Sequence, residues 1–100
     1  MSELVTYTFE NNISLITLDD GKANVFSVQM LTELNSALDQ AEQAGSVVIL
    51  AGRESMFSGG FDLSVFKSGD NEKILEMLSL GAELSHRMLS FPLPIITACT

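Results

Sequence analysis

Cysteine, histidine and basic residues are scarce in this sequence. It holds one cysteine, Cys99, which excludes an internal disulfide framework. Its one histidine, His86, has no second histidine or cysteine near it in sequence, so we expect no metal site. Five Lys and Arg residues stand against thirteen Asp and Glu, which gives a net charge of −8. Because nucleic-acid binding needs a basic stripe, these counts exclude that class of function.

Long apolar runs and a leader-like N-terminus are also missing. No run approaches the roughly 18 apolar residues that span a bilayer, so we expect no membrane span. The first residues, Met1-Ser2-Glu3-Leu4, are acidic and lack the basic region and apolar core of a signal peptide. Together with the single cysteine, this N-terminus predicts a cytoplasmic protein.

The length allows one domain or part of one. Of the 100 residues, 46% are hydrophobic. A chain of this size buries only roughly two-thirds of its unfolded surface, so this apolar content suggests faces meant for further chain or for other subunits. The final segment, 95–100, is predicted to be a buried strand with nothing after it to cover it. We therefore expect residues 1–100 to be the N-terminal part of a single longer domain.

Hydrophobic periodicity predicts the elements of the chain. Runs over 5–9 and 13–18 predict a β-hairpin. An amphipathic helix follows, with Ser27 as its N-cap and Gly45 as its stop. A second long helix over 71–89 is apolar on two sides, so we expect it to be covered on more than one side. The short apolar runs 47–51 and 95–100 predict buried strands, the first of them buried on both faces.

The resulting order, ββαβαβ, predicts an α/β fold. Strands that alternate with helices imply right-handed crossovers over a largely parallel, buried sheet. Ligands of open α/β sheets bind beyond the C-terminal ends of the strands. The loop after Leu50-Ala51 lies at such an end.

That loop contains the stretch Phe57-Ser58-Gly59-Gly60-Phe61-Asp62-Leu63. Two adjacent glycines allow positive φ and a close approach to the main chain. If a helical turn begins at Asp62 and runs to about Phe66, the amides around Gly60 and Phe61 have no intrahelical acceptor. We interpret the stretch as half of an oxyanion hole, the alternative being an ordinary turn. Asp62 is expected to be an N-cap rather than a catalytic acid.

Five segments in this order and spacing resemble the enoyl-CoA hydratase/isomerase (crotonase) superfamily. They are Gly21-Lys22-Ala23-Asn24-Val25, the helix beginning near Met30-Leu31, Val47 to Gly52, Ser58 to Leu63, and Pro94 to Ala98. The resemblance runs from about Leu15 to Thr100. It implies a crotonase-like spiral of ββα repeats, of which the ββαβαβ portion is present. It also implies a homo-trimer or hexamer.

The resemblance implies an acyl-CoA enzyme, an enoyl-CoA hydratase or enoyl-CoA isomerase of fatty-acid or related metabolism. In the family, two backbone amides stabilise a thioester enolate, and the first maps onto Phe61. The substrate would border Lys22, Ala23, Gly60, Phe61, Asp62, Leu63 and Ser64, with Lys22 and Ala23 at the nucleotide end. Coenzyme A enters as part of the substrate, and no permanently bound cofactor or metal is implied.

The sequence departs from the family pattern in two ways. Family members usually have alanine where Gly59 stands. The second amide and the catalytic carboxylates come from sequence after the strand Pro94 to Ala98. They are therefore expected beyond Thr100, which leaves this segment incomplete for catalysis.

Two other readings remain open. The first is a non-catalytic protein of the same fold that binds or assembles with CoA esters, because fold does not fix chemistry. The second is a nucleotide-binding α/β domain. The residues from Gly52 to Gly60 form neither G-x-G-x-x-G nor a P-loop, which disfavours that reading.

Overall fold

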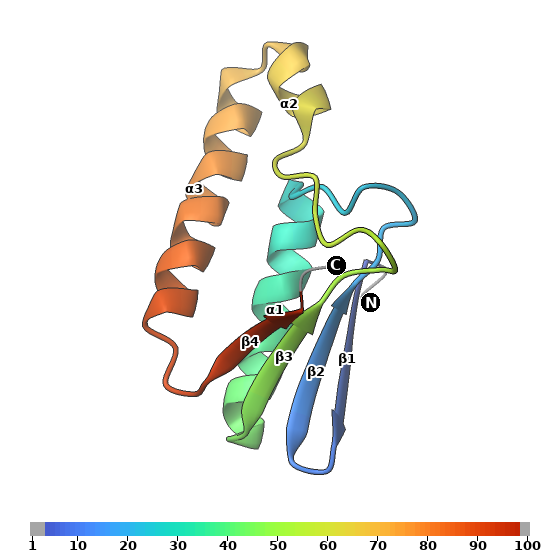
Figure 1. Ribbon diagram of the computed structural model, residues 1–100. Helices are drawn as coiled ribbons and strands as arrows, with labels where there is room; N and C mark the ends of the chain where they lie inside the picture. The colour runs from blue at the N-terminus through green and yellow to red at the C-terminus, as the bar shows by residue number, and fades with distance from the viewer. Residues whose placement is uncertain (1–3, 99–100) are drawn as a thin grey trace.

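The computed structural model describes residues 4–98, so Cys99, predicted to lie in a buried strand, falls outside the described residues. Its elements, in chain order, are β1 (Val5–Glu10), β2 (Ile13–Leu18), α1 (Val28–Ala44), β3 (Val47–Ala51), α2 (Leu63–Ser68), α3 (Asn71–Leu89) and β4 (Ile95–Ala98) (Figure 1). The predicted order is confirmed, and the turn expected after Asp62 is the short helix α2.

The four strands form one sheet in the order β1-β2-β3-β4. β1 and β2 pair antiparallel through the turn at Asn11 and Asn12, both of which have positive φ. β2 with β3, and β3 with β4, pair parallel. This arrangement confirms the predicted α/β fold with a largely parallel sheet. It also puts the C-terminal ends of β2, β3 and β4 at one edge.

Helix α1 begins and ends where its capping residues predict. The Ser27 hydroxyl accepts a hydrogen bond from the Met30 amide at 3.1 Å. At the other end, Gly45 has φ of 70° and its amide donates to the Ala41 carbonyl. The apolar stripe of α1 packs against the sheet and supplies six of the thirteen buried hydrophobic residues of the core, namely Met30, Leu31, Leu34, Ala37, Leu38 and Ala41.

Helix α3 lies beside α1 and is fixed to it by Arg87. The guanidinium donates to Glu42 at 3.2 Å and pairs with Asp39 at 2.8 Å, both on α1. It also lies 5.7 Å from the ring centroid of Phe91. Among the described residues of α3, the buried ones are Met77, Gly81 and Leu84, which share one side of the helix.

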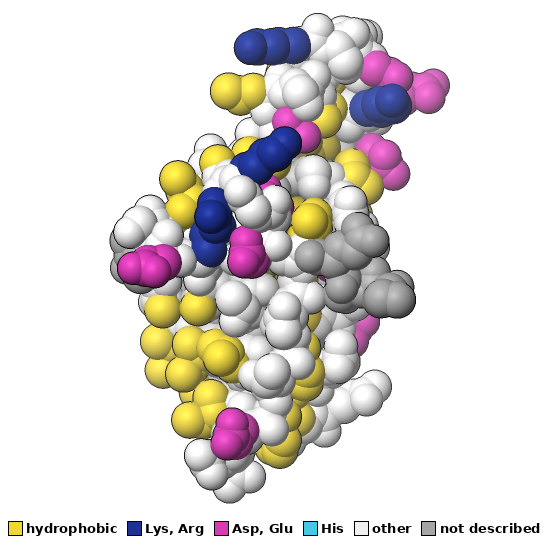
Figure 2. All heavy atoms as spheres, turned by 90° about the vertical axis from the view of Figure 1, so that its right-hand side faces the viewer, with side chains coloured by type: hydrophobic (Ala, Val, Ile, Leu, Met, Phe, Trp, Pro, Cys, Tyr) yellow, Lys and Arg dark blue, Asp and Glu magenta, His cyan; other side chains and the backbone are white. Residues whose placement is uncertain are grey.

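The prediction of burial on both faces of β3 is wrong in this structure, and so is the prediction that α3 is covered on more than one side. Along β3, exposure alternates: Val48 is buried and Val47 is exposed. The helices lie on one side of the sheet, and no element within residues 4–98 covers the other side (Figure 1). Hydrophobic side chains therefore gather on the surface over the strands (Figure 2). The exposed ones include Phe9, Ile13, Leu15, Ile96 on the sheet and Leu75, Leu78, Leu89 on α3.

Candidate functional site

Two loops meet at the C-terminal edge of the parallel strands. Residues 19–27 follow β2, and residues 52–62 follow β3 (Figure 1). Because β2 and β3 run parallel in register, both loops leave the sheet at the same edge. This is the edge at which open α/β sheets bind ligands.

Main-chain hydrogen bonds join the two loops along their length. The Gly59 amide donates to the Ala23 carbonyl at 2.7 Å, and the Phe26 amide donates to the Gly60 carbonyl at 2.7 Å. Phe26 and Phe61 also form an isolated parallel β-bridge. The structure therefore places Ala23 beside the glycine pair, although more than thirty residues separate them in the chain.

The glycine pair presents a free amide at Phe61. Gly60 has φ of 88°, in the left-handed region that favours glycine, and a side chain there would meet open space. In the part of the chain that the structure describes, the Phe61 amide donates no hydrogen bond. This amide is therefore available to an oxygen of another molecule.

Asp62 has a structural partner of its own. Its carboxylate accepts from the Ser64 amide at 3.0 Å and from the Ser64 hydroxyl at 2.7 Å. Asp62 thus caps α2, as predicted. Leu63 is 66% exposed, and Ser64 is exposed as well.

The Phe61 ring packs against α3 at Gly81. A Cβ built on Gly81 would lie 2.6 Å from the ring Cζ and 2.7 Å from Cε1, so only glycine leaves room for the ring. The Phe66 ring meets the Phe61 ring edge-on, with centroids 6.5 Å apart. These contacts hold the residue whose amide is free.

An apolar cavity of about 270 Å³ opens behind this ring. It lies between α1, α3 and the ends of β3 and β4. Its lining includes Phe26, Leu34, Leu50, Phe57, Phe61 and Met88. A cavity of this composition suits a hydrocarbon group.

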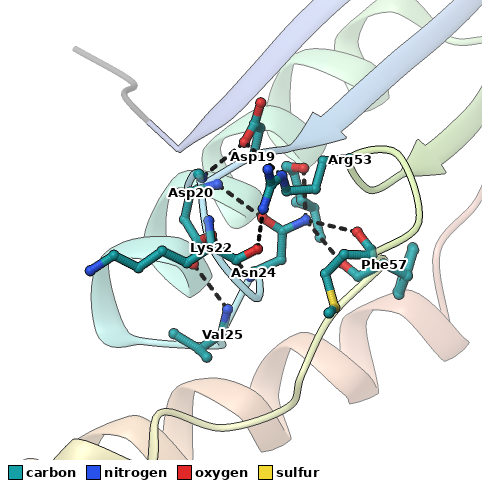
Figure 3. A network of polar contacts seen from close by, with 10 residues as sticks. Asp19, Asp20, Lys22, Asn24, Val25, Arg53 and Phe57 are labelled. Carbon is teal, nitrogen blue, oxygen red and sulfur yellow. Dashed lines mark hydrogen bonds and ion pairs between the residues drawn. The ribbon is translucent and has the colours of Figure 1, made fainter.

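Lys22 and Arg53 differ in how they are held. The Lys22 side chain is exposed and points away from the loop network (Figure 3). Within residues 4–98 its ammonium has no ion pair. Arg53, by contrast, donates to the Lys22 carbonyl and lies 3.5 Å from the Asp19 carboxylate. Lys22 is therefore free to meet an anionic group, whereas Arg53 fixes the loop that carries it.

Asn24 joins both loops to the sheet, and its role is absent from the sequence-based prediction. It is fully buried and has positive φ. The nitrogen of its side-chain amide lies 2.9 Å from the Leu18 carbonyl, 3.2 Å from the Met56 carbonyl and 3.1 Å from the Phe57 carbonyl (Figure 3). Its side-chain oxygen accepts from the Asp20 amide at 2.9 Å. An asparagine in a loop rich in Asp and Gly indicates only a turn, so the sequence carries no signal of these distant contacts.

The Asp20 carboxylate organises the loop before Asn24. Burial opposes its ionisation, but hydrogen bonds from the amides of Asn24, Lys22 and Val25 and the nearby charge of Arg53 outweigh this. They hold the pKa of Asp20 below its usual value. A group with a lowered folded-state pKa stabilises the fold above its unfolded pKa, and this contribution is lost as pH falls through the folded pKa.

We therefore expect Asp20→Asn to lower the thermal stability of the protein at pH 7 and to lower it by a smaller amount at low pH. The difference in Tm from wild type should begin to shrink as pH falls below about 4, where the carboxyl of the unfolded chain becomes protonated, and should shrink further as pH falls through the lower folded-state pKa. Thermal melts between pH 7 and pH 3 measure it. Glu54→Gln, at an exposed carboxylate in the neighbouring loop, is the control. A difference for Asp20→Asn that does not change with pH would contradict this role.

Residues 4–98 also bear on two other kinds of site, a metal centre and a membrane span. No group of three or more His, Cys, Asp and Glu side chains there is placed to hold a metal ion. None of the helices in that range is long and apolar enough to cross a membrane.

Comparison with known proteins gives consistent matches. The family model described as enoyl-CoA hydratase/isomerase matches residues 8–100. A probable enoyl-CoA hydratase of Bacillus subtilis is 34% identical over 97 residues, which cover 94% of this chain and 38% of that protein. The chain thus spans about two-fifths of the length of this relative.

Solved structures agree with the sequence matches. A probable enoyl-CoA hydratase of Mycobacterium tuberculosis is 39% identical with a TM-score of 0.94, over 97% of this chain and 42% of that one. A structure named as an enoyl-CoA isomerase of the same organism is 38% identical with a TM-score of 0.90, over 99% of this chain and 43% of that one. An enoyl-CoA hydratase of Mycobacterium ulcerans is 44% identical with a TM-score of 0.92, over 97% of this chain and 43% of that one. These neighbours carry the crotonase fold, and this chain covers about two-fifths of their length.

Proposed function

Because the chain belongs to the enoyl-CoA hydratase/isomerase family, we propose that the protein containing it is an acyl-CoA enzyme, either an enoyl-CoA hydratase or an enoyl-CoA isomerase. The observation that carries the proposal is the free amide of Phe61, at the glycine turn beyond β3. The similar structures from Mycobacterium tuberculosis bear both names, so we keep both reactions.

In this proposal the Phe61 amide hydrogen-bonds the carbonyl oxygen of the thioester. An enolate forms when water adds to the double bond or when the double bond migrates. In both reactions negative charge builds up on the carbonyl oxygen. A donor fixed in advance stabilises this charge more than it stabilises the neutral carbonyl, so it lowers the barrier. The second amide donor and the carboxylates that move protons are expected beyond Thr100.

The remaining substrate contacts follow from the arrangement of the two loops. Lys22, exposed and without an ion pair among the described residues, would meet a phosphate of coenzyme A. Ala23 would border the nucleotide, and Gly60 to Ser64 would border the thioester and pantetheine. The apolar cavity beside Phe61 offers space for the acyl chain. Coenzyme A is then part of the substrate, and we propose a cytoplasmic homo-trimer or hexamer with no permanently bound cofactor.

Two assays of the complete protein test the proposal. Hydration of crotonyl-CoA reports the hydratase, and conversion of 3-hexenoyl-CoA to 2-hexenoyl-CoA reports the isomerase. Turnover in either assay supports the proposal. Binding of both thioesters without turnover would instead favour a non-catalytic CoA-ester-binding protein, and no binding would contradict both.

A further inference from the structure

Asn24 combines three properties that are not required of a residue that only connects two elements. It has no exposed surface. Its φ of 51° is uncommon for a residue other than glycine. Its side chain binds partners in three segments: the end of β2, its own loop, and the loop after β3. A buried polar group with every partner in place rigidifies its surroundings.

The contacts of Asn24 continue directly to the free amide. The Ser58 hydroxyl donates to the Asn24 carbonyl at 2.8 Å and accepts from the Gly60 amide at 3.0 Å. Gly60 precedes Phe61 in the chain. A movement of Asn24 would therefore reach the Phe61 amide through one side chain.

The side chain of Asn24 also holds the other end of this loop. Its two N–H groups face the carbonyls of Leu18, Met56 and Phe57. Leu18 ends β2, so these bonds fix the loop at 56–57 to the sheet (Figure 3). Without the carboxamide, the three carbonyls lose a shared donor, and residues 57–61 are held to the loop after β2 only by the main-chain bonds at Ala23 and Phe26 and by the Ser58 hydroxyl.

We propose that Asn24 is a positioning residue that sets where the Phe61 amide points. This inference rests on the proposed oxyanion role of that amide. A displacement of about 1 Å in a catalytic group can cost about 10²-fold in rate. Asn24→Gly removes the carboxamide and keeps a residue that tolerates positive φ. We expect it to lower kcat between about tenfold and about 10²-fold with little change in KM.

The direct test is isotope-edited infrared spectroscopy of butyryl-CoA labelled with ¹³C at its carbonyl and bound to the complete protein. Butyryl-CoA has no double bond to hydrate or move, so it stays intact. A hydrogen bond from Phe61 lowers the carbonyl stretching frequency of the bound ligand. We expect wild type to show this shift, and Asn24→Gly to bind the ligand with most of the shift lost. A loss of stability alone would reduce the amount of bound ligand but not its frequency.

The control is Asn12→Gly, since Asn12 also has positive φ but lies in the exposed hairpin turn at the other end of the sheet. It should keep the full shift. Ser58→Ala removes the link from Asn24 to Gly60 alone and should lose part of the shift, even if Asn24→Gly does not fold. A full shift in Asn24→Gly, or in Ser58→Ala, overturns the positioning role while leaving the proposed function intact. No shift in wild type overturns the proposed function itself.

Discussion

Gly52→Ala is expected to lower the free energy of unfolding by about 3 kcal/mol, the upper end of the usual cost of overpacking. A Cβ at this position would lie 2.5 Å from the Met56 carbonyl oxygen and 2.5 Å from the Phe57 Cα. Both are backbone atoms, so no side chain can rotate away to relieve the clash. The loop after β3 must move, and with it the two carbonyls that Asn24 holds. Chemical denaturation of wild type and variant measures the change.

Gly59→Ala is the matched control for Gly52→Ala. Neither glycine has positive φ, and a Cβ at Gly59 would lie 3.3 Å from both the Cβ and the carbonyl oxygen of Ala23, contacts that a shift of a few tenths of an ångström relieves. Its unfolding free energy should stay within about 1 kcal/mol of wild type. Equal losses in the two variants would show that the backbone clash at Gly52 is not the cause.

Gly81→Ala is expected to lower kcat by about 10²-fold through displacement of Phe61. The new methyl group would overlap the Phe61 ring at 2.6 Å. Phe66 lies edge-on to the Phe61 ring, so the ring must turn toward the apolar cavity, and we expect the backbone at Phe61 to follow it. Alanine is a better helix former than glycine by about 1 kcal/mol, so α3 itself should not weaken. Steady-state kinetics of the complete protein with crotonyl-CoA or 3-hexenoyl-CoA test this.

A double-mutant cycle with Phe61→Ala separates the ring from the amide. Phe61→Ala keeps the backbone donor, so alone it should reduce kcat less than Gly81→Ala does. In the Phe61→Ala background, Gly81→Ala should have little further effect, because no ring remains to displace. Additive losses in the double variant would mean that Gly81 acts on activity by another route. Ser79→Ala, an exposed position on α3, controls for changes to the helix.

Local signals predicted the elements of the fold well. Ser27, Gly45 and Asp62 act within one turn of their own helix ends, and each caps where its residue type indicates. The alternating strand pattern around Asn11 and Asn12 predicts the hairpin for the same reason. Such features depend on residues close in sequence, so the sequence alone contains them.

Contacts between distant segments were not predictable in this way. Phe61 packs against Gly81, and Asn24 hydrogen-bonds Met56 and Phe57. These contacts join residues twenty or more positions apart in the chain. A glycine inside a helix and an asparagine in a loop each have common local explanations. The prediction that β3 is buried on both faces was wrong, because an apolar run does not show which face of the strand is covered by a helix.

The central claim is that the Phe61 amide, and not its side chain, polarises the thioester. The most direct measurement replaces this one amide by an ester, with phenyllactic acid at position 61 of the complete protein. This deletes the N–H and keeps the ring. We predict that kcat falls by about 10²–10³-fold, the usual cost of losing one oxyanion donor. The same backbone replacement at Asn12 should leave kcat unchanged. An ester at position 61 with wild-type kcat would contradict the account.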